Sequence, residues 1–152
     1  MPRPKISRPE VFLPRTSFPR VRVRRTSTIT YTAATTDNIL VWQSALSDTG
    51  GMWSASDPTK ILFRLTGEVE IEYALQLSQD PIQTVLRLNG DSTLNLDYTV
   101  TKPVSRGPIR VSVRSGDYVQ ILIDAHATND TTVNVNGAAD PRMIVSYATR
   151  GQ

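Results

Sequence analysis

The sequence predicts an all-β protein: a jelly-roll β-sandwich with an extended, proline-rich and basic N-terminal arm. Three observations support this prediction. After residue 25 the chain consists of short runs in which every second residue is apolar, and helical periodicity is nearly absent. Clusters of turn residues separate these runs. Before that point, five prolines stand among 25 residues, and proline fixes φ and disfavours a helix.

Charge separates the arm from the rest of the chain. Residues 1–25 hold eight Lys or Arg and one acid, Glu10, for a net charge of +7. Residues 26–152 hold nine Lys or Arg and 13 acids, for a net charge of −4. A basic tail on a mildly acidic body is typical of an interaction arm, and 25 extended residues reach about 80 Å. We therefore expect an arm over residues 1–25 and one jelly-roll domain over residues 26–152.

Composition argues against several classes of protein. The sequence has no cysteine, so neither disulfides nor thiolate metal sites hold the fold. Its apolar runs are all shorter than the roughly 18 residues that a membrane span needs. The prolines and arginines of the arm interrupt the apolar run of a secretory signal and the helix of a mitochondrial presequence. We expect no association with a membrane.

The first strands of the body are expected at 27–32, 38–46 and 60–65, in short runs rich in β-forming residues. The clearest strand follows at 68–77, where one face holds Val69, Ile71, Tyr73, Leu75 and Leu77. The opposite face holds Glu68, Glu70, Glu72 and Gln76. Three like charges on one face point to solvent or to a basic partner, and the arm is one such partner.

A hairpin signal comes next in the chain. Asn89-Gly90 is a strong turn signal between strands expected at 84–88 and 92–100. Further strands are expected at 109–113, 118–127, 131–137 and 142–148. Long connections at 43–60 and 124–141 interrupt the hairpins, as the crossings of a Greek key require.

Several landmarks fall in the order of a known family. They are the run from Ile61 to Gly67 leading into GEVEI, LRLNG at 86–90, VRSGDYV at 113–119 and an apolar strand at 143–147. On these landmarks, residues 40–148 resemble the globular head domains of the complement type and, more distantly, the tumour necrosis factor superfamily. The resemblance implies a homotrimer. It also implies that the strand after Gly-Asp lies nearest the trimer axis, with these residues at the subunit interface: Tyr118, Gln120 and Leu122.

A jelly roll with a long N-terminal strap is also similar to the cement, or decoration, proteins on the heads of tailed phages. In those proteins a trimeric body sits on the shell and the arms reach over neighbouring capsomers. The likeness implies a structural virion protein that stabilises the shell and does no catalysis. Its implied partner is the major capsid protein or another virion protein, and no cofactor or metal is expected.

The arm has the composition of a segment that docks on protein. Its apolar residues are spaced to suit successive pockets, and a phenylalanine on an extended arm must be buried by a partner. The expected partner-binding residues are Val11, Phe12, Leu13, Arg15, Phe18, Arg20 and Arg22. Eight basic residues also suit phosphate, as in the inward arms of small RNA-virus coat proteins. Phosphate needs neither the prolines nor the apolar residues, so the composition favours a protein partner.

Other features give weaker site hypotheses. His126, the only histidine, shares a strand face with Asp124, but a nucleophile-elbow motif is missing and we expect a surface or inter-subunit histidine. Residues 129–140 gather oxygen donors without EF-hand spacing, which favours a polar loop over a calcium site. Trp42 and Trp53 form either a sugar platform or, as we expect for at least one, part of the core.

Three further functions stay open on this sequence. One is a tail, collar or fibre component with the same head domain. Another is a receptor- or glycan-binding head that uses its distal loops. The third is an RNA-virus coat protein with a nucleic-acid-binding arm, and an enzyme has the least support.

Overall fold

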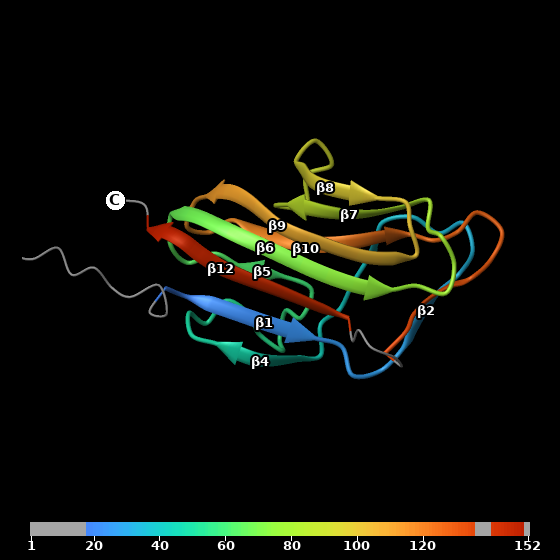
Figure 1. The fold of residues 1–152 in the computed structure, drawn as a ribbon, viewed down its shortest axis with the longest axis horizontal. Helices are drawn as coiled ribbons and strands as arrows, with labels where there is room; N and C mark the ends of the chain where they lie inside the picture. Colours follow the sequence, from blue (N-terminus) through green and yellow to red (C-terminus); the bar gives the residue numbers. More distant parts are fainter. Residues whose placement is uncertain (1–17, 136–140, 151–152) are drawn as a thin grey trace, which may run out of the picture.

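The structure, a computed structural model, describes residues 18–135 and 141–150, which contain strands and no helix (Figure 1). The described residues therefore include no helix that is long and apolar enough to cross a membrane. The strands are β1 (Arg20–Arg24), β2 (Ile29–Tyr31), β3 (Asn38–Ile39), β4 (Ser44–Asp48), β5 (Ile61–Leu62), β6 (Gly67–Gln76), β7 (Gln83–Leu88), β8 (Asn95–Thr99), β9 (Pro103–Val113), β10 (Tyr118–Asp124), β11 (Thr131–Val133) and β12 (Arg142–Arg150).

The first sheet has five antiparallel strands in the order β4-β1-β12-β6-β9. β6 shows the alternation that the sequence predicts, because its apolar side chains are buried and Glu72 on the opposite face is exposed. β12 alternates in the same way, with Met143, Val145 and Tyr147 buried. The sheet therefore has an apolar inner face and a polar outer face.

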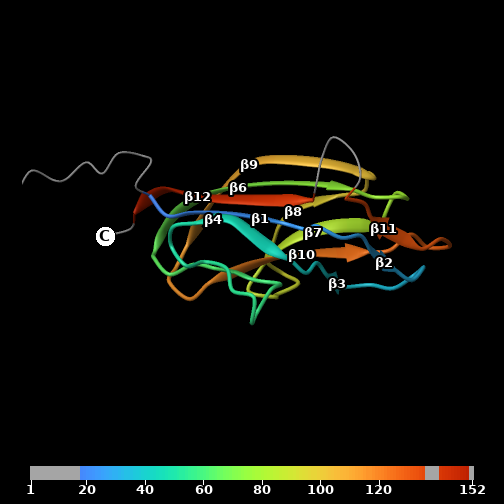
Figure 2. The same ribbon diagram turned by 90° about the horizontal axis from the view of Figure 1, so that it is seen from below.

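The second sheet follows the order β3-β10-β7-β8, and β5 pairs with another part of β10. Val119, Ile121 and Ile123 of β10 are fully buried and face the first sheet. Figure 2 shows the two sheets as separate layers, and the short pair β11-β2 lies at one end of the sandwich. This architecture confirms the prediction of an all-β jelly roll.

Large side chains fill the space between the layers. Trp42 is 1% exposed, so at least one of the two tryptophans belongs to the core, as predicted. The rings of Phe63 and Tyr147 meet edge to face with centroids 6.2 Å apart. The Tyr147 hydroxyl donates a 2.6 Å hydrogen bond to the carbonyl of Leu65, which satisfies the polar end of a buried ring.

The two predicted turns are bonded to each other. Asn89 and Gly90 both have positive φ, at 56° and 65°, as the hairpin signal predicts. The loop is longer than a two-residue turn, because β7 ends at Leu88 and β8 begins at Asn95. The Asn89 side chain donates to the Asp117 carboxylate and accepts from the Tyr118 amide, each at 2.9 Å. These bonds therefore join the hairpin loop to the Gly-Asp turn at the start of β10.

The domain boundary predicted after residue 25 is wrong. β1 pairs with β12 over its whole length and also with β4, so residues 20–24 are part of the sandwich. Val21 and Val23 are fully buried, whereas Arg20 and Arg22 are exposed. The body therefore begins no later than Arg20. The predicted arm residues before Phe18 lie outside the described residues.

β9 is also longer than predicted, because a bulge accommodates Gly107. The register between β6 and β9 shifts between Ile71 and Tyr73, which leaves Glu72 at the bulge. Gly107 has φ 130°, and a Cβ placed on it would lie 2.7 Å from Glu72 Cγ and 2.8 Å from Glu72 Cα. Only glycine lets β9 continue through this point.

A polar cluster joins the two sheets at the β8 and β9 edges. The buried Tyr73 hydroxyl donates a 2.9 Å hydrogen bond to Asp97 on β8. Arg106 on β9 donates two more to the same carboxylate, at 2.8 and 2.7 Å. The bond from Arg106 holds the pKa of Asp97 below its usual range, and burial raises the pKa of Tyr73. The cluster therefore links the two sheets at this edge, where no described strand of one sheet pairs with a strand of the other.

Replacing Asp97 with alanine should lower the free energy of unfolding by about 2 kcal/mol at neutral pH. It removes hydrogen bonds to a charged group and leaves the buried Tyr73 hydroxyl unpaired, although water partly screens the exposed side of Arg106. Because the folded state lowers the pKa of Asp97, its contribution is complete above the unfolded value of about 3.9 and disappears as the pH falls below it. Urea unfolding of wild type and Asp97→Ala between about pH 2.5 and pH 7 tests this. Parallel pH profiles for the two proteins would contradict it.

Candidate assembly surface

The outer face of the first sheet carries two stripes of opposite charge. Three arginines of β1 alternate with buried valines and point away from the core: Arg20, Arg22 and Arg24. Arg142 of β12 also points outward and is the register partner of Arg24. We call these four residues the basic stripe. The acidic stripe consists of Glu68, Glu70 and Glu72 on β6.

β12, which begins at Arg142 of the basic stripe, separates β1 from β6. In the register of the sheet, Ile144 stands between Arg22 and Glu72. Because neighbouring strands are about 4.8 Å apart, the Cα atoms of that arginine and that glutamate are about 10 Å apart. Figure 2 shows the sheet as one outside layer of the sandwich, and no other described strand lies over its outer face. A partner can therefore contact both stripes together.

Arg110 of β9 borders the acidic stripe on its far side. Its guanidinium donates a 2.6 Å bond to Glu70 and lies 3.4 Å from a carboxylate oxygen of Glu68. The bond to Glu70, together with both negative charges, raises the pKa of Arg110. The acidic stripe therefore has a cation of its own at one end, whereas Glu72 is exposed beside the Gly107 bulge.

Arg25 departs from the pattern of the preceding arginines. Its side chain is 5% exposed and donates to the backbone carbonyls of Ser27 and Val41. Burial lowers the pKa of Arg25 and raises that of the neighbouring Tyr31. Arg20, Arg22 and Arg24 of the run RVRVRR thus point outward and belong to the basic stripe. Arg25, the last residue of the run, is buried, and its hydrogen bonds hold the chain just after β1 in place.

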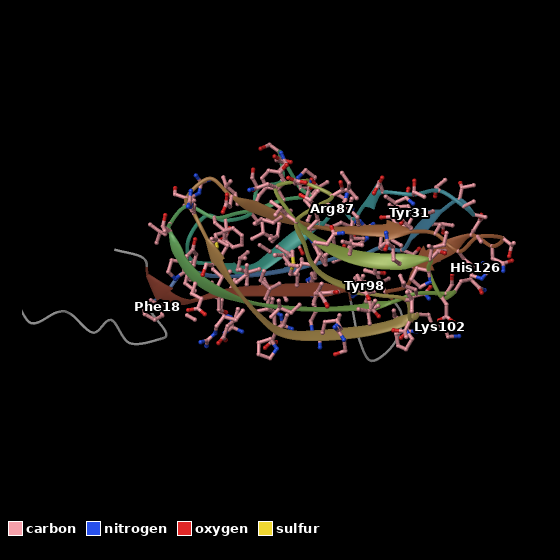
Figure 3. The ribbon with its side chains drawn as sticks, turned by 90° about the horizontal axis from the view of Figure 1, so that it is seen from above. Phe18, Tyr31, Arg87, Tyr98, Lys102 and His126 are labelled. Carbon is pink, nitrogen blue, oxygen red and sulfur yellow. The ribbon has the colours of Figure 1, made fainter. Side chains whose placement is uncertain are left out.

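Phe18 lies at the root of the predicted arm, at one end of the molecule (Figure 3). It is partly buried and packs against the core cluster, so its burial does not depend wholly on a partner. A hollow of about 480 Å³ adjoins it, bordered by residues of β1, β4, β6 and β12 that include Arg20, Glu70 and Tyr147. Among the predicted partner-binding residues, Arg20 and Arg22 are therefore on the charged face. The others lie outside the described residues: Val11, Phe12, Leu13 and Arg15.

The residues predicted for the subunit interface are on β10, in the second sheet and away from the charged face. Gln120 and Leu122 are each 5% exposed in the single chain. Gln120 donates a 2.9 Å hydrogen bond to Thr59. The ammonium of Lys60 lies 4.5 Å from the ring centroid of Tyr118. Their assignment to a subunit interface stays a prediction.

His126 and Asp124 have separate roles. The Asp124 carboxylate accepts hydrogen bonds from the Asp37 amide and from Gln83, at 2.6 and 2.9 Å. The His126 ring nitrogen Nδ1 accepts from the backbone amides of residues 128 and 129, each at 3.2 Å. These bonds stabilise neighbouring loops. That the chain has no catalytic site stays a prediction.

The oxygen-rich loop also satisfies backbone groups where the structure describes it. Asp130 accepts a 2.9 Å hydrogen bond from the Ala33 amide. Asn136 and Asp140 lie outside the described residues. Among the residues the structure covers, no three His, Asp or Glu side chains are grouped closely enough to hold a metal ion.

Trp53, unlike Trp42, lines a small surface hollow. The hollow measures about 140 Å³ and its wall includes Tyr118, Lys60 and Asp57. The Trp53 indole donates a 3.2 Å hydrogen bond to the Pro58 carbonyl, which fixes the ring. Alternation alone does not reveal this hollow, because its residues come from a loop and from the start of β10.

Comparison with known proteins supports the fold. No family model and no curated protein matches this sequence. Solved structures that are similar include Eiger TNF from S. frugiperda, with a TM-score of 0.58 and 14% identity over 89% of this chain and 95% of that one. Pika GITRL gives 0.53 and 10% over 89% and 98%, and bushbaby GITRL gives 0.51 and 15% over 87% and 96%. The chain therefore has a jelly roll like that of tumour necrosis factor ligands.

Proposed function

We propose that this chain is a structural virion protein, a homotrimeric cement or decoration protein of a phage capsid. The observation that carries the proposal is a charged sheet face that no other described strand covers, on a trimer-type jelly roll, with a proline-rich basic segment before Phe18 in the sequence. In this proposal the body joins copies and the arm clamps the shell. Fold alone does not fix function, so the charged face and the arm carry the argument.

The division of work follows from the composition of each part. An arm rich in proline loses little conformational freedom when it binds, so it is suited to reach over a neighbouring capsomer. The body adds buried area between subunits and needs no chemistry. We propose that it acts in the virion without cofactor, metal or membrane, with the major capsid protein or another virion protein as its partner.

A small-ligand hollow favours one second candidate function, a glycan-binding head. Trp53 offers an indole ring, and Lys60 and Asp57 offer polar groups beside it. Aromatic rings with a few polar groups are the usual lining of such sites, although 140 Å³ is below the usual size of ligand pockets. Saturation-transfer NMR with free monosaccharides tests this candidate, and a signal lost in Trp53→Ala would support it.

Co-sedimentation with bare phage shells tests the proposed function. The full chain should sediment with shells that lack it and should raise the temperature at which they disassemble. Because the arm is proposed to dock on protein, its binding to DNA or RNA should be weak and lost at about 150 mM salt. Submicromolar nucleic-acid binding at that salt, without shell binding, would favour the coat-protein alternative.

A further inference from the structure

We propose that the two stripes are the two halves of one contact between copies of this chain. The basic stripe of one copy lies against the acidic stripe of the next. The inference rests on the proposed function, which requires a homotrimer, and it adds the face and the chemistry that join the copies. It places this contact on the first sheet, whereas the family resemblance implies an interface on β10 of the second sheet. The partner that fits this face is a second copy of the chain.

The basic stripe carries a cost in the single chain that a second copy would relieve. Arg24 and Arg142 are direct register partners on neighbouring strands, and like charges in that arrangement destabilise a sheet. The Arg24 side chain donates a 3.3 Å bond to the neutral Ser44 hydroxyl, which leaves its charge uncompensated at that contact. Carboxylates from another molecule would neutralise this pair of guanidinium groups.

Glu72 is the carboxylate that the structure assigns to this contact. Arg110 is bound to Glu68 and Glu70 from the β9 side, so these two are already engaged within the chain. Glu72 is exposed, stands in the same row as Arg22 and projects beside the Gly107 bulge, where β9 is displaced in register. Glu72 of one copy and Arg22 of the next therefore form the central pair.

The arrangement suits a closed ring. A contact that joins two different patches is heterologous, and repeating it with a constant rotation closes a ring of copies. Five strands and the ten-residue β6 give a face of roughly 800 Å², which is about what each partner contributes to a stable interface. In a ring of three, each copy uses one half of that face, about 400 Å², toward each neighbour, so the stripes supply about half of the area that a standard interface needs.

The arrangement of charges on this face favours a second copy of the chain over nucleic acid as the partner. Phosphate would be attracted to the four arginines, but the carboxylate of Glu72 lies only about 10 Å away across β12 and would repel it. A second copy presents both signs in the order that matches. Such a contact between oppositely charged stripes should weaken as salt screens it.

Charge exchange within the full chain tests the proposal. Sedimentation velocity at about 50 and about 500 mM NaCl should show that wild type associates, more strongly at low salt. R22E and E72R should each weaken association at least tenfold, because each places like charges in the contact. The combined variant R22E/E72R should recover wild-type association to within about threefold, since it restores opposite charges with their positions exchanged.

Lys102→Glu is the matched control, because it changes the net charge as R22E does. This exposed lysine immediately precedes β9, outside both stripes and at the end of the sandwich opposite Phe18 (Figure 3). The association of the Lys102→Glu variant should not change. E72Q replaces E72R if arginine does not fit beside Gly107, and it should weaken association less. A double variant as weak as the single variants would overturn the inference. Association of R22E and E72R as strong as that of wild type would also overturn the inference. If those two variants still form a trimer, the proposed function is not contradicted. Loss of shell binding by a salt-sensitive trimer would contradict only the proposed function.

Discussion

Replacing Phe12 with alanine should release the chain from the shell while the body stays folded and associated. A phenylalanine buried by a partner removes a large apolar surface from water, and its truncation costs about 3–5 kcal/mol. A loss of that size lowers affinity by more than about 100-fold. Co-sedimentation of full-length Phe12→Ala with bare shells measures it, and circular dichroism checks the fold.

Phe18 needs a separate variant, because it packs against the core of the body. Phe18→Ala should therefore lower thermal stability as well as attachment, and only Phe12→Ala isolates the arm. The double variant Arg3→Ala/Arg8→Ala is the comparison for charge, since an exposed ion pair contributes roughly 0–1 kcal/mol. Full attachment of Phe12→Ala together with release of the arginine variant would mean that the arm is an electrostatic tether.

Gly107→Ala should destabilise the sandwich by about 3 kcal/mol or more. The residue has φ 130°, a conformation that costs an L-residue roughly 1–3 kcal/mol. In addition, the new Cβ would lie 2.8 Å from Glu72 Cα and 2.9 Å from the Ile71 carbonyl, so β6 or β9 must move. Urea unfolding gives the change in the free energy of unfolding.

Gly116→Ala is the matched control for this substitution. Gly116 also has positive φ, at 97°, but a Cβ there would meet no atom within 4 Å. It should therefore show the backbone cost alone, and Gly107→Ala should exceed it. Equal effects would mean that β9 relaxes at the bulge without displacing β6.

Alternation within a single strand allowed the body to be predicted well. Residues 68–77 have their apolar side chains buried as expected, and the Asn-Gly hairpin lies where its turn chemistry places it. The same signal was available in Val21 and Val23, but the surrounding arginines and prolines favoured an arm, and β1 was assigned to it. The first half of β9 was missed because Gly107 and Pro108 are strand breakers unless a bulge accommodates them.

Only the acidic half of the charged face could be predicted from the sequence. The acidic stripe follows from the alternation of β6 alone. The basic stripe becomes its neighbour only because β12, the last strand, pairs with both β1 and β6. A pairing between residues more than 100 positions apart leaves no local pattern, so the juxtaposition of the two charges required the fold.

The long axis of the sandwich gives the molecule a direction. β1 begins and β12 ends at the same end, next to Phe18, whereas His126 lies at the opposite end (Figure 3). On a particle that holds the protein through its N-terminal segment, the exposed loop at 127–130 would be far from the root of that segment. A foreign epitope inserted in this loop would thus be carried outward in many copies, which makes the chain a candidate scaffold for antigen display.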